Sequence, residues 1–154
     1  MKIKSLVTGG LGFIGSNLVD LLVEEGHEVS VIDDLSTGYA EYAHPQVKYH
    51  TKDIRKYGEI EGLFEGMDYV FHLAALPRVE PSIINPMASD SINTQGSLNV
   101  FFAAKEAGVK KVIFSSSSSI YGDVPPKKVC EKLAPNPLSP YGLQKLFGEQ
   151  YLEL

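Results

Sequence analysis

The sequence predicts an α/β fold built on a doubly wound parallel sheet, and three observations carry this prediction. Short apolar runs of strand type alternate with segments of helical periodicity along the whole chain. The first apolar run ends in a cluster of glycines, and the fifth leads directly into five consecutive serines. Because strands that alternate with helices form parallel βαβ units, this order favours one twisted sheet with helices on both faces.

The first half of the chain predicts three strands and two helices. Residues 3–10, 28–34 and 47–53 are apolar runs of strand length. Residues 13–26 have helical periodicity and end at a glycine, while residues 53–66 predict a helix that two internal glycines weaken. The apolar face of the first helix is expected to consist of Ile14, Leu18, Leu21 and Leu22.

The second half predicts two further strands and two longer helices. Residues 68–75 and 110–118 are the fourth and fifth strands, and a loop with several prolines follows the fourth at 77–86. Helices are predicted at 89–107 and 139–154, the second with a proline in its first turn.

The serine run has two interpretations. A run of serines is typical of a flexible linker. Here it directly follows Val112, Ile113 and Phe114, so a linker would separate a strand from the helix that it leads to. We therefore place the serines at the carboxyl end of the fifth strand, where open α/β sheets bind ligands. Strand alternation would put one set of hydroxyls on a common face, namely Ser115, Ser117 and Ser119.

The composition is that of one globular domain. Its 154 residues can bury roughly 70% of the unfolded surface. The 19 acidic and 14 basic residues are scattered, and no basic stripe suggests nucleic acid. Cys130 is the one cysteine, so no internal disulfide can form, and a reducing compartment is expected. No run approaches the roughly 18 apolar residues of a membrane helix. Together these two features favour a cytoplasmic protein. No metal site is expected, because no ligand spacing relates His27, His44, His50 and His72.

The segment "TGGLGFIG" predicts dinucleotide binding. Gly9, Gly12 and Gly15 lie between a predicted strand and a predicted helix. In a Rossmann-type fold the first glycine makes the sharp turn, the second lets the backbone approach a pyrophosphate, and the third packs the helix closely. The helix N-terminus then offers free N–H groups to the phosphates. Glycines also occur in ordinary turns, but not usually in this strand-to-helix context.

Asp33 predicts NAD as the dinucleotide. It ends the second predicted strand, about 20 residues beyond the glycines, where an acidic side chain accepts hydrogen bonds from the adenosine ribose. A carboxylate there would repel a 2′-phosphate, and no arginine follows immediately to offset it. The alternative role of a turn former can be filled by Asp34 instead.

Tyr141 and Lys145 predict a general base. They lie four residues apart on the last predicted helix, which puts them on one face about 6 Å apart at Cβ. An ammonium about 5 Å from a phenolate stabilises it by about 3 kcal/mol at an effective dielectric near 20. The spacing alone is weak evidence for a general base. It becomes stronger evidence because the pair follows a dinucleotide-binding pattern and a strand that ends in serines.

In order along the chain, "TGGLGFIG", "VIDDLSTG", "KDIR", "HLAA", "FSSSSSIYGD" and "SPYGLQK" resemble the extended short-chain dehydrogenase/reductase family of NAD-dependent sugar-nucleotide epimerases and dehydratases. The resemblance covers essentially all 154 residues. It is nearest to the UDP-glucose 4-epimerases and their UDP-N-acetylglucosamine relatives, and is less specific for the sugar. Two departures are Gln144, where many relatives carry Ser or Thr, and Pro77, where some carry a basic residue.

By position, the resemblance implies a catalytic set of Ser117, Tyr141 and Lys145. Ser117, four residues before the tyrosine of "IYGD", would hydrogen-bond the reacting sugar hydroxyl. Tyr141 would accept its proton, and Lys145 would hold the nicotinamide ribose. The residues implied to bind the cofactor are Gly9, Gly12, Phe13, Ile14, Gly15, Asp33, Asp34, Ser36, Thr37, Gly38, Asp53, Ile54, Leu73, Ala74, Ala75, Asn93, Ser115, Tyr141 and Lys145.

Some of these roles have plain alternatives. Asp53 and Ile54 are implied to contact the adenine, and Asn93 to have a structural or cofactor role. The segment 73–75 would form a backbone cradle for the cofactor, although sheet core explains it too. His72 is expected to be a satisfied strand-end residue rather than a catalyst.

The resemblance implies 4-epimerisation through a transient 4-keto sugar. Relatives that dehydrate or decarboxylate sugar nucleotides typically carry acidic residues just after the reactive serine or threonine. Ser118 and Ser119 occupy those positions here. The alternatives are therefore a dehydratase or decarboxylase of the same family, or a non-catalytic NAD-binding module.

The length is short for this family. A dinucleotide-binding sheet has about six strands, and we count five. We expect residues 1–154 to be the N-terminal, NAD-binding part of a longer enzyme, a truncated product or a deliberately shortened chain, with weak NAD binding if any and little turnover alone. The resemblance also implies a homodimer through helices 89–107 and 139–154.

Overall fold

Five parallel strands form one sheet in the order β3-β2-β1-β4-β5. The computed structural model describes residues 2–124 and 129–154. Because the chain starts in the middle, winds to one edge and returns to the other, the sheet is doubly wound, as predicted. The crevice of such a sheet lies where the winding reverses, here between β1 and β4. The strands are β1 (Lys4–Thr8), β2 (Glu28–Asp33), β3 (Lys48–Thr51), β4 (Tyr69–His72) and β5 (Lys111–Phe114).

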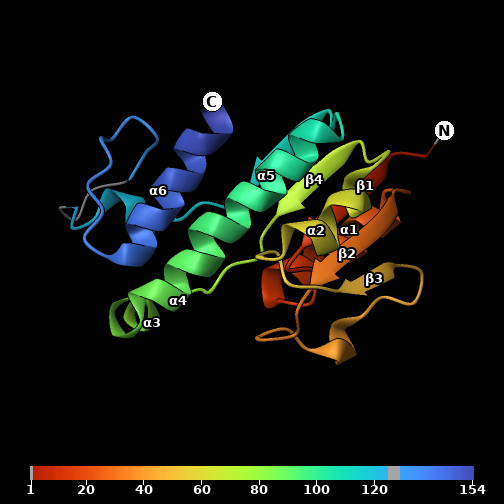
Figure 1. Cartoon of the computed structure of the whole chain (residues 1–154), viewed down its shortest axis with the longest axis horizontal. Helices are drawn as coiled ribbons and strands as arrows, with labels where there is room; N and C mark the ends of the chain where they lie inside the picture. Colours follow the sequence, from red (N-terminus) through yellow and green to blue (C-terminus); the bar gives the residue numbers. More distant parts are fainter. Residues whose placement is uncertain (1, 125–128) are drawn as a thin grey trace.

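Helices cover both faces of the sheet (Figure 1). A continuous helical run crosses the molecule from α4 through a π-helical segment, Ser91–Gly96, into α5, and α6 packs beside it. No helix in the described part of the chain is long and apolar enough to cross a membrane. The α-helices are α1 (Phe13–Glu24), α2 (Tyr57–Ile60), α3 (Val79–Ile84), α4 (Pro86–Asp90), α5 (Ser97–Glu106) and α6 (Pro140–Glu153).

Side-chain alternation along the strands divides the core into two apolar layers. Leu6, Ile32 and Val70 face the layer under α2 and α5, with Phe64 and Val100 among the partners that cover them. Their neighbours in sequence face α1: Val7 and Val31 pack with Val19 and Leu22. A period of two along strands buried on both faces is what a parallel sheet requires.

The apolar face predicted for the first helix was wrong in part. The structure buries Gly15, Val19 and Leu22, whereas Ile14 is 65% and Leu21 52% exposed. Gly15 is held against the carbonyl of Gly9, where no side chain fits. This close approach sets the rotation of α1, so that positions 15, 19 and 22, one helical face, meet the sheet.

Two predicted segments differ in length. The helix predicted at 53–66 is only the short α2 followed by a 3₁₀ turn, Glu61–Phe64. The loop predicted at 77–86 contains α3, and the next helical run begins at Pro86, with the Asn85 side chain accepting from the Ala88 N–H as its cap. The final helix has the predicted bounds within one residue at each end.

The serines follow β5 rather than extend it. The strand ends at Phe114, and a 3₁₀ turn occupies Ser118–Tyr121. The prediction that Ser115, Ser117 and Ser119 alternate along a strand was therefore wrong, because strand pairing with β4 stops at Phe114. The position at the carboxyl edge of the sheet is confirmed.

Candidate functional site

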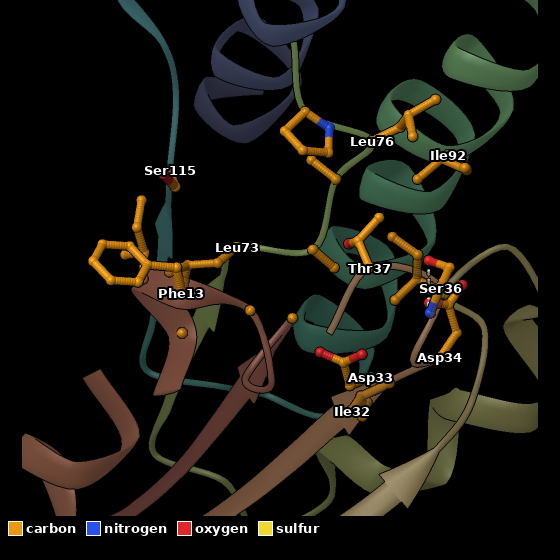
Figure 2. A pocket seen from close by; sticks show the side chains of 18 of the residues that line it. Phe13, Ile32, Asp33, Asp34, Ser36, Thr37, Leu73, Leu76, Ile92 and Ser115 are labelled. Atoms are coloured by element: carbon orange, nitrogen blue, oxygen red, sulfur yellow. Dashed lines mark hydrogen bonds between the residues drawn. The ribbon is translucent and has the colours of Figure 1, made fainter. Parts of the chain in front are cut away.

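A cavity of about 850 Å³ opens at the carboxyl edge of the sheet. This volume lies within the range of small-molecule sites. In Figure 2, Asp33, Asp34, Ser36 and Thr37 gather toward one side of it, and Phe13, Leu73 and Ser115 toward the other. The predicted residues that line the cavity are Gly9, Gly12, Phe13, Ile14, Gly15, Asp33, Asp34, Ser36, Thr37, Asp53, Ile54, Leu73, Ala74, Ala75, Ser115, Tyr141 and Lys145.

The glycine loop between β1 and α1 forms one wall. Gly9 has φ +73°, its N–H donates to the Ile32 carbonyl at 2.8 Å, and a Cβ there would come 2.7 Å from the Ala74 nitrogen. Gly12 precedes α1 and supplies no side-chain cap. Since the first turn of a helix has N–H groups without intrahelical partners, the start of this 12-residue helix can bind a phosphate group.

Substitution of the two later glycines should separate folding from binding. A Gly15→Ala methyl would clash with the Gly9 carbonyl, so we expect the free energy of unfolding to fall by about 2–3 kcal/mol. Gly12 has ordinary φ and ψ, and a Cβ there meets nothing closer than 3.4 Å. Gly12→Ala should therefore cost under about 1 kcal/mol, but lower dinucleotide affinity at least tenfold. Urea unfolding and titration calorimetry measure the two effects; equal stability losses would contradict them.

Asp33 connects the glycine loop to the turn after β2. Its Oδ2 accepts the Leu11 N–H at 3.0 Å and its Oδ1 accepts the Leu35 N–H at 2.9 Å. Leu35 has a left-handed φ of 61°, which the Asp33 hydrogen bond helps to hold. Each carboxylate oxygen has a second lone pair, so both can still accept from vicinal hydroxyls.

Asp53 and Ile54 lie on the wall that follows β3. Asp53 forms a bidentate pair with Arg55: its Oδ1 accepts from Nε at 2.9 Å and its Oδ2 from a terminal guanidinium nitrogen at 2.6 Å, and these hydrogen bonds lower the Asp53 pKa. Ile54 is buried, and its carbonyl accepts from the Asn99 amide at 2.9 Å. Ile54 thus makes this end of the cavity partly apolar, and the Asp53 carboxylate there is already paired with Arg55.

Tyr141 and Lys145 project from α6 into the opposite end. Ser139 caps this helix by accepting the Gly142 N–H, and the Tyr141 N–H donates to the Ser82 hydroxyl of α3 at 3.1 Å. Lys145 is 4% exposed; its Nζ donates to the Ser115 carbonyl at 2.8 Å and lies 6.0 Å from the Tyr141 ring centroid. Burial lowers the Lys145 pKa to about 8. The structure therefore brings the predicted phenol and amine together.

Three predicted residues do not line the cavity. The Ser117 hydroxyl accepts the Ser119 N–H at 3.1 Å and caps the 3₁₀ turn, so its role toward a substrate stays a prediction. Gly38 packs against Asp33 and Leu11. Asn93 is buried beneath the loop after β4 and hydrogen-bonds Leu76, which favours the structural one of its two expected roles.

Ser116 is a cavity residue that the sequence reasoning did not single out. Its Oγ is buried and, within residues 2–124 and 129–154, has no hydrogen-bond partner. It lines the cavity together with Ser115. A buried hydroxyl without a partner is costly, so a ligand group that reaches it would be favoured.

Other cavity residues were missed for lack of a local pattern. Arg78 has φ 85° and ψ 147°, a conformation that only glycine adopts readily, and it forms no ion pair among the described residues. Its position in a proline-rich loop after a strand is the one signal that could have marked it. The remaining missed residues are Ile32, Tyr39, Tyr42, Lys52, Leu76, Pro81 and Ile92, whereas Pro77, noted above as a departure from some relatives, lines the cavity as well.

His72 is a satisfied buried residue, as expected. Its ring contacts the Thr8 hydroxyl at 2.6 Å and the Ser97 hydroxyl at 2.9 Å. Burial, and secondarily the charge of Lys145, lowers the His72 pKa to about 3. The imidazole is thus neutral at physiological pH and does not line the cavity.

The cavity has a different chemistry at each end. The Asp33 side offers carboxylates and the start of α1 offers backbone amides, which together suit a nucleoside and a pyrophosphate. The other end offers a phenol, a buried amine and serine hydroxyls, which suits proton transfer. No group of three His, Cys, Asp or Glu residues that could hold a metal occurs in the described ranges.

Comparison with known proteins gives the family context. A profile of the NAD dependent epimerase/dehydratase family matches residues 5–154. The chain is 38% identical to a UDP-glucose 4-epimerase of Mycolicibacterium smegmatis over 98% of its own length and 50% of that protein.

Solved structures give the same result. A Thermotoga maritima UDP-glucose 4-epimerase with UDP-glucose superposes with a TM-score of 0.94 at 40% identity, covering 98% of this chain and 50% of that one. A Thermus thermophilus UDP-glucose 4-epimerase in complex with NAD gives 0.94 at 37% identity, with the same coverage. The chain thus spans about half the length of the relatives that it matches.

Proposed function

Because the chain belongs to the NAD-dependent epimerase/dehydratase family, we propose that residues 1–154 form the NAD-binding domain of an enzyme that epimerises a UDP-sugar at C4, of the UDP-glucose/UDP-galactose type. One observation carries this proposal: Tyr141 and Lys145 lie together at one end of a cavity whose other walls are the glycine loop and Asp33. The similarity to UDP-glucose 4-epimerases supports the substrate class.

The residues present fit NAD. The Gly12 turn and the start of α1 would hold the pyrophosphate, and Asp33 would accept from the adenosine ribose. Asp33 and Asp34 together disfavour the 2′-phosphate of NADP by charge repulsion. When bound, NAD would supply a hydride acceptor beside Tyr141.

Tyr141 would act as the base on the sugar 4-hydroxyl. Its phenolate oxygen would take the O4 proton as C4 gives up its hydrogen, as hydride, to the acceptor that NAD supplies, so that C4 would become a ketone. After the keto sugar turns over, Tyr141 would return the proton to O4 as the same hydride comes back to the opposite face of C4. Lys145, held by the Ser115 carbonyl, would bind the nicotinamide ribose and stabilise the phenolate.

The charge distribution supports epimerisation over dehydration or decarboxylation. Elimination or decarboxylation needs a second acid or base at the reacting sugar. In the described part of the cavity wall the carboxylates are Asp33, Asp34 and Asp53, all on the adenosine side. Ser118 and Ser119 carry none at the Tyr141 end. Among the described residues, the end where chemistry would occur therefore offers Tyr141 and Lys145 but no carboxylate.

Product analysis tests the proposed function. The whole protein, incubated with UDP-glucose, should form UDP-galactose to an equilibrium mixture with no net NADH, read by chromatography and absorbance at the NADH band. The 154-residue chain alone should show little or no turnover. A 4,6-dehydrated or decarboxylated sugar nucleotide as the product would overturn the proposal.

Arg78 is expected to bind an anionic oxygen group of the nucleotide sugar. It lines the cavity, carries an unpaired charge among the described residues, and holds a backbone conformation that costs about 1–3 kcal/mol. Arg78→Met should raise KM for the UDP-sugar about 10–100-fold with little change in kcat, since a hydrogen bond to a charged group contributes about 1.5–3 kcal/mol. Lys48→Met, exposed on β3 and outside the cavity lining, is the matched control. An unchanged KM would remove Arg78 from the site.

We also propose a homodimer through α5 and α6, and a cytoplasmic location. Exposed apolar side chains on these helices support the dimer: Phe102, Leu143, Phe147 and Tyr151 are each 40–47% exposed. The lone thiol of Cys130 is consistent with a reducing compartment. Light scattering of the whole protein, with Phe102→Lys as the disruptive variant, tests the dimer.

A further inference from the structure

Gln144 is a buried amide in the turn of α6 that carries Lys145. It is 4% exposed. Its Oε1 accepts two hydrogen bonds, from the Ser89 hydroxyl at 2.8 Å and from the Asn93 Nδ2 at 2.9 Å. Both donors belong to the helical run that crosses beneath α6. One side-chain oxygen thus ties α6 to a neighbouring element, one residue away from the predicted catalytic amine.

Asn93 carries the connection on to the cavity wall. Its Oδ1 accepts the Leu76 N–H at 2.8 Å, and its Nδ2 donates to the Leu76 carbonyl at 3.1 Å. Leu76 lines the cavity, in the loop that continues from the cradle segment 73–75. Asn93 lies in the π-helical segment, a local widening that is frequent at functional sites. Through Asn93, Gln144 is linked to the backbone of the cofactor wall.

The same chain of hydrogen bonds extends to the glycine loop. The Ser97 hydroxyl donates to the Asn93 carbonyl at 2.6 Å, so it must accept from the His72 Nε2–H. His72 Nδ1 is then an acceptor, and the Thr8 hydroxyl donates to it. Thr8 in turn accepts the Ala74 N–H at 3.3 Å. In this arrangement Ser97, His72, Thr8 and the Ala74 N–H each donate to one acceptor. The His72 ring must be neutral, because its Nδ1 accepts a hydrogen bond.

A buried polar chain of this kind is not the cheapest way to fill a core. Apolar side chains of similar volume give equal or greater stability, whereas a half-satisfied network is costly. What the polar chain adds is a defined position. It joins three segments that the proposed function needs in register: Thr8 before the glycine loop, Leu76 beyond the cradle, and Gln144 in the catalytic helix.

We infer that Gln144 is a positioning residue. By accepting hydrogen bonds from Ser89 and Asn93, it fixes the position of Tyr141 and Lys145 relative to the cavity wall formed by Leu73–Leu76. The inference rests on the proposed function and adds a residue to it. Gln144 is not among the residues that line the cavity, so it acts through α6. An acceptor at this place is what matters, because both of its partners donate.

Three variants test the acceptor. Gln144→Met keeps the length and removes the oxygen; we expect kcat of the whole protein to fall about 10–100-fold with KM within twofold. Gln144→Glu keeps an oxygen that both donors can reach. The fall in log kcat for this variant should be at most half of the fall for Gln144→Met. Gln150→Met, on the exposed side of the same helix, is the matched control and should leave kcat unchanged.

Two further measurements need no turnover, so they separate this inference from the proposed function. Hydrogen exchange of the Leu76 amide in the 154-residue chain should accelerate at least tenfold in Gln144→Met and not in Gln150→Met. The titration midpoint of Lys145, followed by NMR, should rise toward its ordinary value by about one unit as water reaches the amine. If Gln144→Met does not fold, Ser89→Ala should show smaller changes of the same sign, because it removes one donor to Gln144 and a longer contact with Asn93 Nδ2 at 3.3 Å but leaves the Asn93–Gln144 hydrogen bond in place.

The outcomes are distinct. If the wild-type protein has no epimerase activity but Gln144→Met still shows the Leu76 and Lys145 changes, the proposed function is wrong and the positioning role stands. Gln144→Met behaving like Gln150→Met in kcat, Leu76 exchange and Lys145 titration would overturn the inference.

Discussion

Tyr141→Phe should lower the rate of epimerisation by the whole protein by about 10²–10⁴-fold, the contribution typical of a positioned general base. The substitution removes one oxygen and leaves the ring. The Tyr141 backbone N–H that donates to Ser82 is unaffected, so α6 should keep its position against α3. The measurement is kcat for the conversion of UDP-glucose to UDP-galactose, together with Kd for NAD, which should stay within about threefold.

This variant also separates the enzyme from a non-catalytic NAD-binding module. A module has no use for the phenol, and its activity in the cell would survive the loss of it. Tyr69→Phe, on β4 and outside the cavity lining, is the control for loss of a phenol elsewhere. Full activity and full NAD binding in Tyr141→Phe would remove the basis of the proposed mechanism.

Acid should destabilise the domain through His72 well above the range in which carboxylates titrate. The folded protein holds this imidazole neutral, with its pKa lowered to about 3, whereas the unfolded chain takes up a proton near pH 6.5. Stability is therefore complete above pH 6.5 and is lost as the pH falls toward 3. At about 1.4 kcal/mol per pH unit, the loss is about 2 kcal/mol by pH 5 and about 5 kcal/mol near pH 3.

Urea unfolding at pH 7 and pH 5 measures the first part of this effect. His72→Gln, whose amide can donate and accept as the neutral imidazole does, should lose most of the difference between the two pH values. Nitrogen NMR shifts provide a second measurement on the wild type, where His72 should keep an Nε2-protonated neutral ring at pH 5. An imidazolium signal from His72 at that pH would contradict the assignment.

The fold was predictable because its signals are local. The alternation of strands and helices, and the glycines between the first of each, depend on neighbouring residues and fix the order of a parallel sheet. The face of α1 was not predictable from periodicity, because a tertiary contact between Gly15 and the Gly9 carbonyl decides it. Ile14 and Leu21 are apolar but lie on the side that the sheet does not cover.

The candidate site was predictable where motifs mark it and not elsewhere. The sequence marks Asp33, Tyr141 and Lys145 by their spacing from other motif residues, and all three line the cavity. The end of β5 could not be placed from a uniform run of serines, since the point where pairing with β4 stops is a tertiary property. The Gln144–Asn93–Leu76 contacts join residues far apart in the chain, and no spacing rule brings them together.

A crystal structure of this domain with NAD would show whether the cavity holds the dinucleotide in the proposed direction. We expect the pyrophosphate over Gly12 and the start of α1, the adenosine ribose on Asp33, and the nicotinamide in contact with the Tyr141 ring and the Lys145 amine. A reversed dinucleotide, with adenine beside Tyr141, or a cofactor that leaves the Tyr141 end empty, would contradict this expectation.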